Sequence, residues 1–131
     1  MIDLKDDISL AVNVRQRAYV PYSHYKVGAV LTCKNGKKYT GCNVENGGIQ
    51  SICAERTAFC KAISEGEREF DYIVVIGGKE DRQLEECLPC GYCRQFMRSY
   101  VDLDFKIYTY SDEFGIHEYT LEELLPHSFD L

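Results

Sequence analysis

The 131-residue sequence contains no tryptophan and only three prolines. It also has no continuous apolar run of roughly eighteen residues, the length at which a membrane-spanning helix becomes a candidate. The opening segment, MIDLKDDISLAVNV, lacks the basic stretch followed by an apolar stretch that is typical of a secretory signal. These absences predict a cytoplasmic protein with no membrane partner.

Positive charge is also scarce in this sequence. Lys and Arg together number 15 against 21 Asp and Glu, which gives a formal net charge of −6. Proteins that bind nucleic acid neutralise its phosphates with clustered Lys and Arg. We therefore expect no nucleic-acid partner, and a small ligand fits this composition better.

Cysteine, in contrast, is abundant, with seven residues in the chain. Seven thiols cannot all pair within one molecule, and a cytoplasmic protein keeps them reduced. A chain of this length can also bury enough surface to fold without disulfides. We therefore expect a single domain over residues 1–131 whose thiols are available as metal ligands.

Hydrophobic periodicity and turn residues predict the element order α-β-β-α-β-α-β-β-α. The expected helices are residues 4–19, 53–65, 91–101 and 121–126, and the expected strands are 25–33, 38–45, 71–78, 105–111 and 116–120. Asn35-Gly36 predicts a hairpin turn between the first two strands, and Thr120 with Glu123 predicts a capping box for the last helix. This order predicts an α/β fold with three α-β-α layers and a mixed central sheet, with 71–78 as a buried central strand.

Two cysteine motifs stand at predicted helix starts, where ligands commonly bind in such folds. They are SICAERTAFCKAI at residues 51–63 and CLPCGYCRQFM at 87–97. Cys90 and Cys93 form a Cys-x-x-Cys pair that one helical turn can direct at one ion, and Cys53 supplies a third thiolate. The residue types therefore predict a zinc site.

Two other interpretations of these cysteines are open on spacing alone. Cys87 could complete a closed structural site with four cysteine ligands. A thioredoxin-like dithiol would use only Cys90 and Cys93, and would leave Cys53 and Glu55 unexplained. Glu55 favours an open catalytic site, because a carboxylate beside a closed anionic centre would add repulsion, whereas in an open site it would carry protons.

The motifs CAERTA and PCGYCRQ resemble the paired motif of the cytidine deaminases of the kind with three cysteine ligands. PYSHYKVGA, GCNVEN and LLPHSF extend the resemblance over almost the whole chain. The resemblance implies zinc-dependent hydrolytic deamination of cytidine and 2′-deoxycytidine to the uracil nucleosides and ammonia, a reaction of pyrimidine salvage. A small-molecule nucleoside is then the expected substrate, and one Zn²⁺ per chain the expected cofactor.

The same resemblance assigns roles to individual residues. Cys53, Cys90 and Cys93 would hold the zinc, Glu55 would move the protons, and Arg56 would donate to the thiolates. The side chains of Asn43 and Glu45 would bind the ribose 3′-hydroxyl, and the backbone at Ala54 would contact the edge of the pyrimidine. The rings of Tyr25 and Phe129 would lie against the base. Helix amino termini pointing at the metal would offset part of the negative charge of the thiolates.

The small cytidine deaminases usually form homotetramers, and Phe129 matches a phenylalanine that a neighbouring subunit supplies. The resemblance therefore implies a homotetramer in which neighbouring subunits complete the active sites.

The sequence departs from the family pattern at two places. The loop Gly47–Ile52 is one residue shorter than usual and has Gly48 or Ile49 where the family has a tyrosine near the sugar. Tyr92 replaces the small residue that is usual between the two late cysteines. These departures leave open a deaminase of a modified cytosine nucleoside or a blasticidin-like compound, and a zinc-stabilised interaction module without catalysis is a further alternative.

Overall fold

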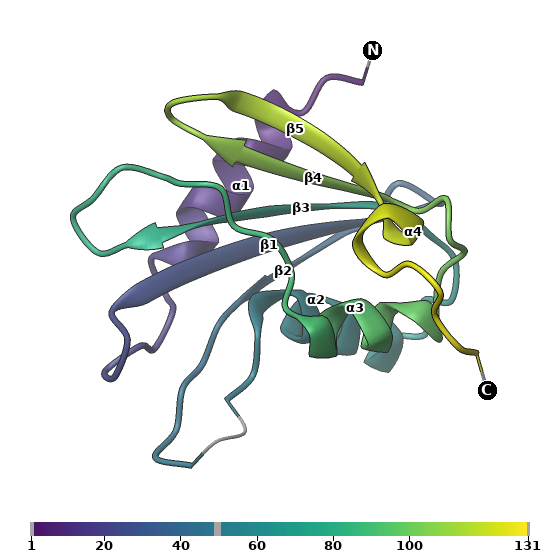
Figure 1. Ribbon diagram of the computed structural model, residues 1–131, viewed down its shortest axis with the longest axis horizontal. Coiled ribbons are helices and arrows are strands. Elements are labelled where there is room, and N and C mark those ends of the chain that lie inside the picture. The colour runs from purple at the N-terminus through teal and green to yellow at the C-terminus, as the bar shows by residue number, and fades with distance from the viewer. Residues whose placement is uncertain (1, 49–50, 131) are drawn as a thin grey trace.

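A five-stranded mixed sheet forms the middle of the protein, which a computed structural model describes over residues 2–48 and 51–130 (Figure 1). The spatial order is β2-β1-β3-β4-β5, and the strands are β1 (Tyr25–Cys33), β2 (Lys38–Cys42), β3 (Phe70–Lys79), β4 (Lys106–Ser111) and β5 (Gly115–Thr120). β3 and β4 pair in parallel, and the other neighbouring strands of this sheet pair antiparallel. The predictions of a mixed sheet and of a buried central strand, now β3, are confirmed.

Helices cover both faces of this sheet (Figure 1). The apolar side chains of β3 alternate between two cores. Ile73 and Val75 pack with α2 (Ala54–Ser64), α3 (Gly91–Arg98) and α4 (Leu121–Leu124), and Val74 and Ile76 pack with α1 (Lys5–Arg15) on the opposite face. The expected three-layer arrangement and the expected order of nine elements are therefore confirmed.

The turns and the last helix cap follow the local sequence. Gly36 has a φ of 90°, which a residue without Cβ adopts at little cost, and its amide donates to the Cys33 carbonyl at 2.9 Å to close the first hairpin. Thr120 and Glu123 form the predicted capping box at the start of α4. The hairpin turn and the cap are both confirmed.

The predicted helix 4–19 is wrong at its end, because α1 stops at Arg15. Beyond it, the Tyr19 amide donates to the Asn43 carbonyl at 3.1 Å, and the Tyr19 carbonyl accepts from the Glu45 amide at 2.8 Å. Tyr19 thus pairs with the segment that follows β2 and leaves the helix to do so. Four other elements also end earlier than expected, at Cys42, Ser64, Arg98 and Leu124.

Gly41 fixes the position of α2 against the sheet. A Cβ atom at Gly41 would lie 2.5 Å from the Ala54 carbonyl oxygen and 2.6 Å from the Ala58 nitrogen, closer than real contacts allow. Glycine therefore lets the first turn of α2 approach β2 at backbone distance. The start of α2, which carries one of the two cysteine motifs, is held by this contact.

None of the helices in the described part of the chain is long and apolar enough to cross a membrane.

Candidate metal centre

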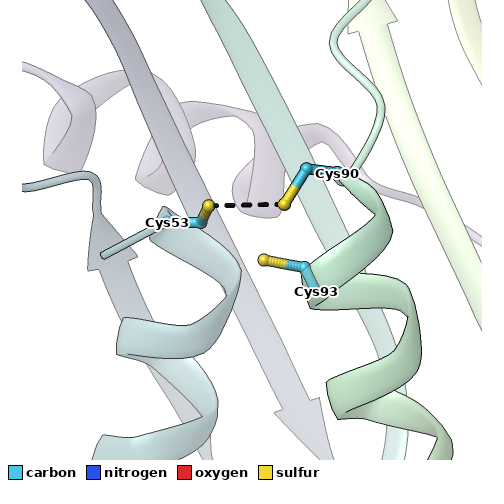
Figure 2. A group of neighbouring side chains, drawn as sticks. All are labelled: Cys53, Cys90 and Cys93. Atoms are coloured by element: carbon cyan, nitrogen blue, oxygen red, sulfur yellow. Dashed lines mark hydrogen bonds between the residues drawn. The ribbon is translucent and has the colours of Figure 1, made fainter. Parts of the chain in front are cut away.

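Two helices begin at cysteines, and their thiols meet. Cys53 is the N-cap of α2 and Cys90 the N-cap of α3, both with extended backbone and neither with its side chain bound to the helix end. Their sulfur atoms lie 3.6 Å apart, and the Cys93 sulfur joins them so that all three lie within 4.8 Å of one another. Figure 2 shows the three side chains pointing toward one another from the two helices.

This cluster fits a zinc ion. Two sulfurs bound to one tetrahedral zinc at about 2.3 Å lie roughly 3.8 Å apart. The Cys53–Cys90 separation of 3.6 Å is close to this value, all three sulfurs lie within 4.8 Å of one another, and all seven cysteines are free thiols. Three thiolate ligands are also a soft donor set that suits zinc. Cys53, Cys90 and Cys93 could therefore hold the ion and leave its fourth position open.

The electrostatic surroundings of the cluster favour an ionised Cys53. Each helix amino terminus carries roughly half a positive charge, and α2 and α3 both start at the cluster. A hydrogen bond from Cys93, which has the largest effect, and one from Arg56 lower the pKa of Cys53 to about 5. Burial acts in the opposite direction and raises this pKa. Cys53 is thus the thiol prepared to ionise, whereas its hydrogen bond with Cys93, followed by burial, raises the pKa of Cys93.

Arg56 contacts the cluster directly. Its Nη2 donates to the Ser51 carbonyl oxygen at 2.9 Å and lies 3.7 Å from the Cys53 sulfur. Burial alone would lower the pKa of Arg56, but hydrogen bonds with the Cys53 and Cys93 sulfurs raise it on balance. The structure therefore brings Arg56 to the sulfur of Cys53.

Glu55 is buried beside the cysteines. Its side chain is 4% exposed, and burial raises its pKa to about 7, with the Cys53 sulfur raising it further and Arg56 opposing the shift. A carboxyl group with a pKa near neutrality can both accept and release a proton under ordinary conditions. The geometry and burial of Glu55 are thus suited to proton transfer.

Cys87 does not join the cluster of three sulfurs. Its sulfur lies against Gly77 of β3, so close that a Cβ atom added at Gly77 would be 2.7 Å from it. Burial raises the pKa of the Cys87 thiol to about 12. Between this residue and Cys90 the chain passes through the buried Pro89, whose carbonyl accepts from Arg94 Nε at 2.7 Å. The structure places Cys87 in a packing position.

Arg94 is a residue of this site that the sequence reasoning missed. Besides its contact with Pro89, its Nη1 donates to the Leu124 carbonyl at 2.7 Å. It therefore ties the approach to α3 to the end of α4. The only sequence signal was the position of Arg94 directly after Cys93 in the motif PCGYCRQ. That position does not indicate which carbonyl groups the Arg94 side chain reaches.

Asn43 and Glu45, predicted to bind ribose, are engaged with the backbone. Asn43 Oδ1 accepts from the Val27 amide at 2.9 Å, and its Nδ2 donates to the Tyr25 carbonyl at 2.9 Å. The Asn43 side chain thus continues the hydrogen bonding along β1 beyond the end of β2. One amide hydrogen of Asn43 is left for a ligand, since each side-chain amide carries two.

The Glu45 carboxylate holds the turn before β1. Its Oε1 accepts from the Tyr22 and Ser23 amides at 3.1 Å each, and its Oε2 accepts from the Ser23 hydroxyl at 2.5 Å. The Ser23 hydroxyl bond is the leading cause that keeps the pKa of Glu45 below its usual range. A carboxylate has about four acceptor sites, so it retains capacity for a substrate hydroxyl.

The remaining predicted residues are spread around the two cysteine-bearing helices. Ala54 is fully buried at the first position of α2, Tyr25 is half-buried at the start of β1, and Phe129 is 61% exposed near the C-terminus. Tyr92 does not point into empty solvent, because the Arg56 guanidinium carbon lies 4.0 Å from the centre of its ring. Ile49, one candidate for the missing tyrosine, lies outside the described residues.

Comparison with known proteins points to one family. Residues 1–109 match the model of the cytidine and deoxycytidylate deaminase zinc-binding region. The chain is 42% identical over 123 residues to a cytidine deaminase of Halalkalibacterium halodurans, covering 93% of this chain and 90% of that protein. It is 28% identical over 129 residues to a blasticidin-S deaminase of Bacillus cereus, covering 93% and 91%.

A solved structure agrees with these matches. The crystal structure of a cytidine deaminase from Burkholderia pseudomallei superposes with a TM-score of 0.86 at 34% sequence identity, covering 98% of this chain and all of that one.

Proposed function

The chain belongs to the cytidine and deoxycytidylate deaminase family, and on this premise we propose that it deaminates cytidine and 2′-deoxycytidine with one Zn²⁺ held by Cys53, Cys90 and Cys93. The reaction consumes one water, replaces the C4 amino group by oxygen and releases ammonia. The observation that carries the proposal is the meeting of three thiols at two helix amino termini, with a buried carboxyl group beside them.

The metal and the protein have separate tasks in this proposal. A bound zinc ion with an open position acts as a Lewis acid and lowers the pKa of a coordinated water. Glu55 accepts one proton from the attacking water and delivers it to N3 of the pyrimidine; it then takes the second proton from the oxygen now bound to C4 and delivers it to the departing amino group. A pKa near 7 supports this double role, because the carboxyl group then changes state readily in both directions.

Arg56 supplies positive charge where the thiolates have an excess of negative charge. Three thiolates around a divalent cation leave one net negative charge, which disfavours ionisation of a neighbouring acid. The contact of Arg56 Nη2 with the Cys53 sulfur at 3.7 Å supports its role in offsetting that charge. The amino termini of α2 and α3 act in the same direction.

Substrate binding is assigned to five residues. The backbone at Ala54 contacts the pyrimidine edge, and the free capacity of Asn43 and Glu45 accommodates the ribose 3′-hydroxyl. Tyr25 lies beside the base. Phe129 acts on the base of a neighbouring subunit in a homotetramer, an assignment that its 61% exposure supports.

The protein functions as one domain over residues 1–131 in the cytoplasm, where the reducing environment keeps all seven thiols available.

A blasticidin-like substrate is the second candidate. One observation in its favour is the 28% identity to the blasticidin-S deaminase of B. cereus. The other is that two exposed glycines, Gly47 and Gly48, stand in the segment where the family has a tyrosine near the sugar.

A substrate panel separates these candidates. Zinc-loaded protein is incubated with cytidine, 2′-deoxycytidine, cytosine, 2′-deoxycytidine monophosphate and blasticidin S, and ammonia release is measured for each. The proposal expects the two nucleosides to have the highest kcat/KM. If blasticidin S had the highest kcat/KM, the proposed substrate would be wrong and the proposed deamination chemistry would stand. If no compound released ammonia, the assignment as an enzyme would be overturned.

A further inference from the structure

Tyr92 covers the guanidinium group of Arg56. Tyr92 is the second residue of α3 and Arg56 the third residue of α2, so the contact joins the two helices that carry the cysteine ligands. The Arg56 guanidinium carbon lies 4.0 Å from the centre of the ring, well within the about 6 Å at which a cation and an aromatic face attract.

The contacts of Arg56 with Ser51 and Cys53 use one nitrogen atom. Nη2 donates to the Ser51 carbonyl and approaches the Cys53 sulfur. Nε is buried and has no hydrogen-bond partner among the residues that the structure describes. The aromatic ring is therefore a principal contact of the guanidinium, and it limits the directions in which the group can move away from Cys53.

The fold itself does not depend on this contact. Tyr92 is 64% exposed and lies outside both apolar cores. The two helices already pack through Phe59 and Phe96, whose ring centres are 6.3 Å apart in an edge-to-face arrangement. Removal of the Tyr92 ring should therefore leave the helices in place and change the setting of Arg56.

We propose that Tyr92 is a positioning residue that holds Arg56 against the Cys53 thiolate and so slows the loss of zinc from the site. This inference rests on the proposed function, because it assumes zinc at the three cysteines. The physical reason is that the ring attracts the cation and shields it from water, and charge interactions are stronger when water is excluded. Phenylalanine should serve as well as tyrosine, because the ring face and not the hydroxyl makes the contact.

The test measures the rate at which a chelator that reports zinc by absorbance removes the ion, at fixed pH and without substrate. Tyr92→Ala should release zinc about 2- to 30-fold faster than the unmodified protein, the range that corresponds to measured cation–aromatic attractions. Tyr92→Phe should release zinc at the unmodified rate. Phe114→Ala, which removes another exposed ring from the turn between β4 and β5, is the matched control and should have no effect.

A double substitution tests whether Tyr92 acts through Arg56. In an Arg56→Gln background, adding Tyr92→Ala should cause no further acceleration, because the cation that the ring holds is already gone. Equal release rates for Tyr92→Ala and the unmodified protein would overturn the inference alone, as would full acceleration by Tyr92→Ala in the Arg56→Gln background. Absence of bound zinc in the unmodified protein would overturn both the inference and the proposed function.

Discussion

The sulfur atoms of Cys53 and Cys90 lie 3.6 Å apart although 37 positions separate them in the sequence. Each is the last residue before a helix, so two helix amino termini meet at the same point. Three ionised thiols at such distances would repel one another strongly unless positive charge lay among them. The zinc proposed at the cluster would supply that positive charge, together with Arg56 and the two helix ends.

Replacement of single cysteines should separate the three ligands from the fourth nearby thiol. Cys87→Ser should bind one zinc per chain and retain deamination, because the Cys87 sulfur packs on Gly77 and stands apart from the cluster. Cys90→Ser and Cys93→Ser should lose metal or activity. Elemental analysis of the purified variants, together with an ammonia assay, gives the answer.

Comparable zinc loss in the Cys87 variant would contradict the open site and indicate four cysteine ligands. The control Cys60→Ser, an exposed thiol on α2, should match the unmodified protein in both assays.

Glu55→Gln should keep the fold and the metal but remove the group that moves protons. Loss of general acid–base catalysis typically costs about 10² to 10⁴ in rate, and more where one group serves several transfers. Measurement of kcat with zinc content in parallel checks this. Glu65→Gln, at the exposed C-terminal end of the same helix, serves as the control, and near-normal turnover by Glu55→Gln would refute the assigned role.

Arg56→Ala should shift the acidic limb of the pH–rate profile to higher pH. Arg56 lowers the pKa of Glu55, which burial has already raised to about 7, so removal of the guanidinium raises that pKa further. The ionised carboxylate is then reached only at higher pH, and activity at neutral pH should fall. Profiles of kcat/KM for zinc-loaded protein test this, and an unchanged limb with full activity would show that Arg56 does not tune the site.

Asp7 should stabilise the opposite face of the sheet without affecting the site. It is 2% exposed and accepts from the Tyr72 hydroxyl at 2.6 Å, and its other oxygen lies 2.6 Å from Lys38 Nζ. Asp7→Asn should lower the free energy of unfolding by roughly 1 to 3 kcal/mol, because Lys38 loses its anionic partner.

Urea denaturation of the zinc-loaded protein measures this effect, with the exposed neighbour Asp6→Asn as control. Equal stability of the two variants would show that the buried pair contributes nothing, and a change in kcat would contradict the separation of the two faces.

Local chemistry made much of the fold predictable from the sequence. Gly36 and Gly115 mark tight turns with positive φ, Thr120 and Glu123 cap a helix, and the β-branched run in β3 indicates a strand buried on both faces. Each of these signals depends on residues close together in the chain. The residue types predicted a zinc site that joins Cys53 to Cys90 and Cys93, and the family resemblance assigned all three as ligands, since spacing alone does not state which helix ends adjoin.

Features that depend on long-range pairing were not predictable in the same way. The end of α1 at Arg15 is set by the pairing of Tyr19 with Val44, which no helix signal near Arg15 indicates. The burial of Asp7 depends on Lys38 and Tyr72, which lie on two different strands. The contact of Tyr92 with Arg56 likewise joins two helices, so the sequence marked Tyr92 as unusual but could not give its partner.

The most direct test of hydrolytic deamination is the mass of the product formed in ¹⁸O-labelled water. Zinc-loaded protein is incubated with cytidine, and the pyrimidine product is analysed by mass spectrometry beside an ammonia assay. The account predicts uridine that carries one labelled oxygen at C4, with one ammonia released for each uridine formed. Recovery of unchanged cytidine, or of uridine without the label, would contradict it.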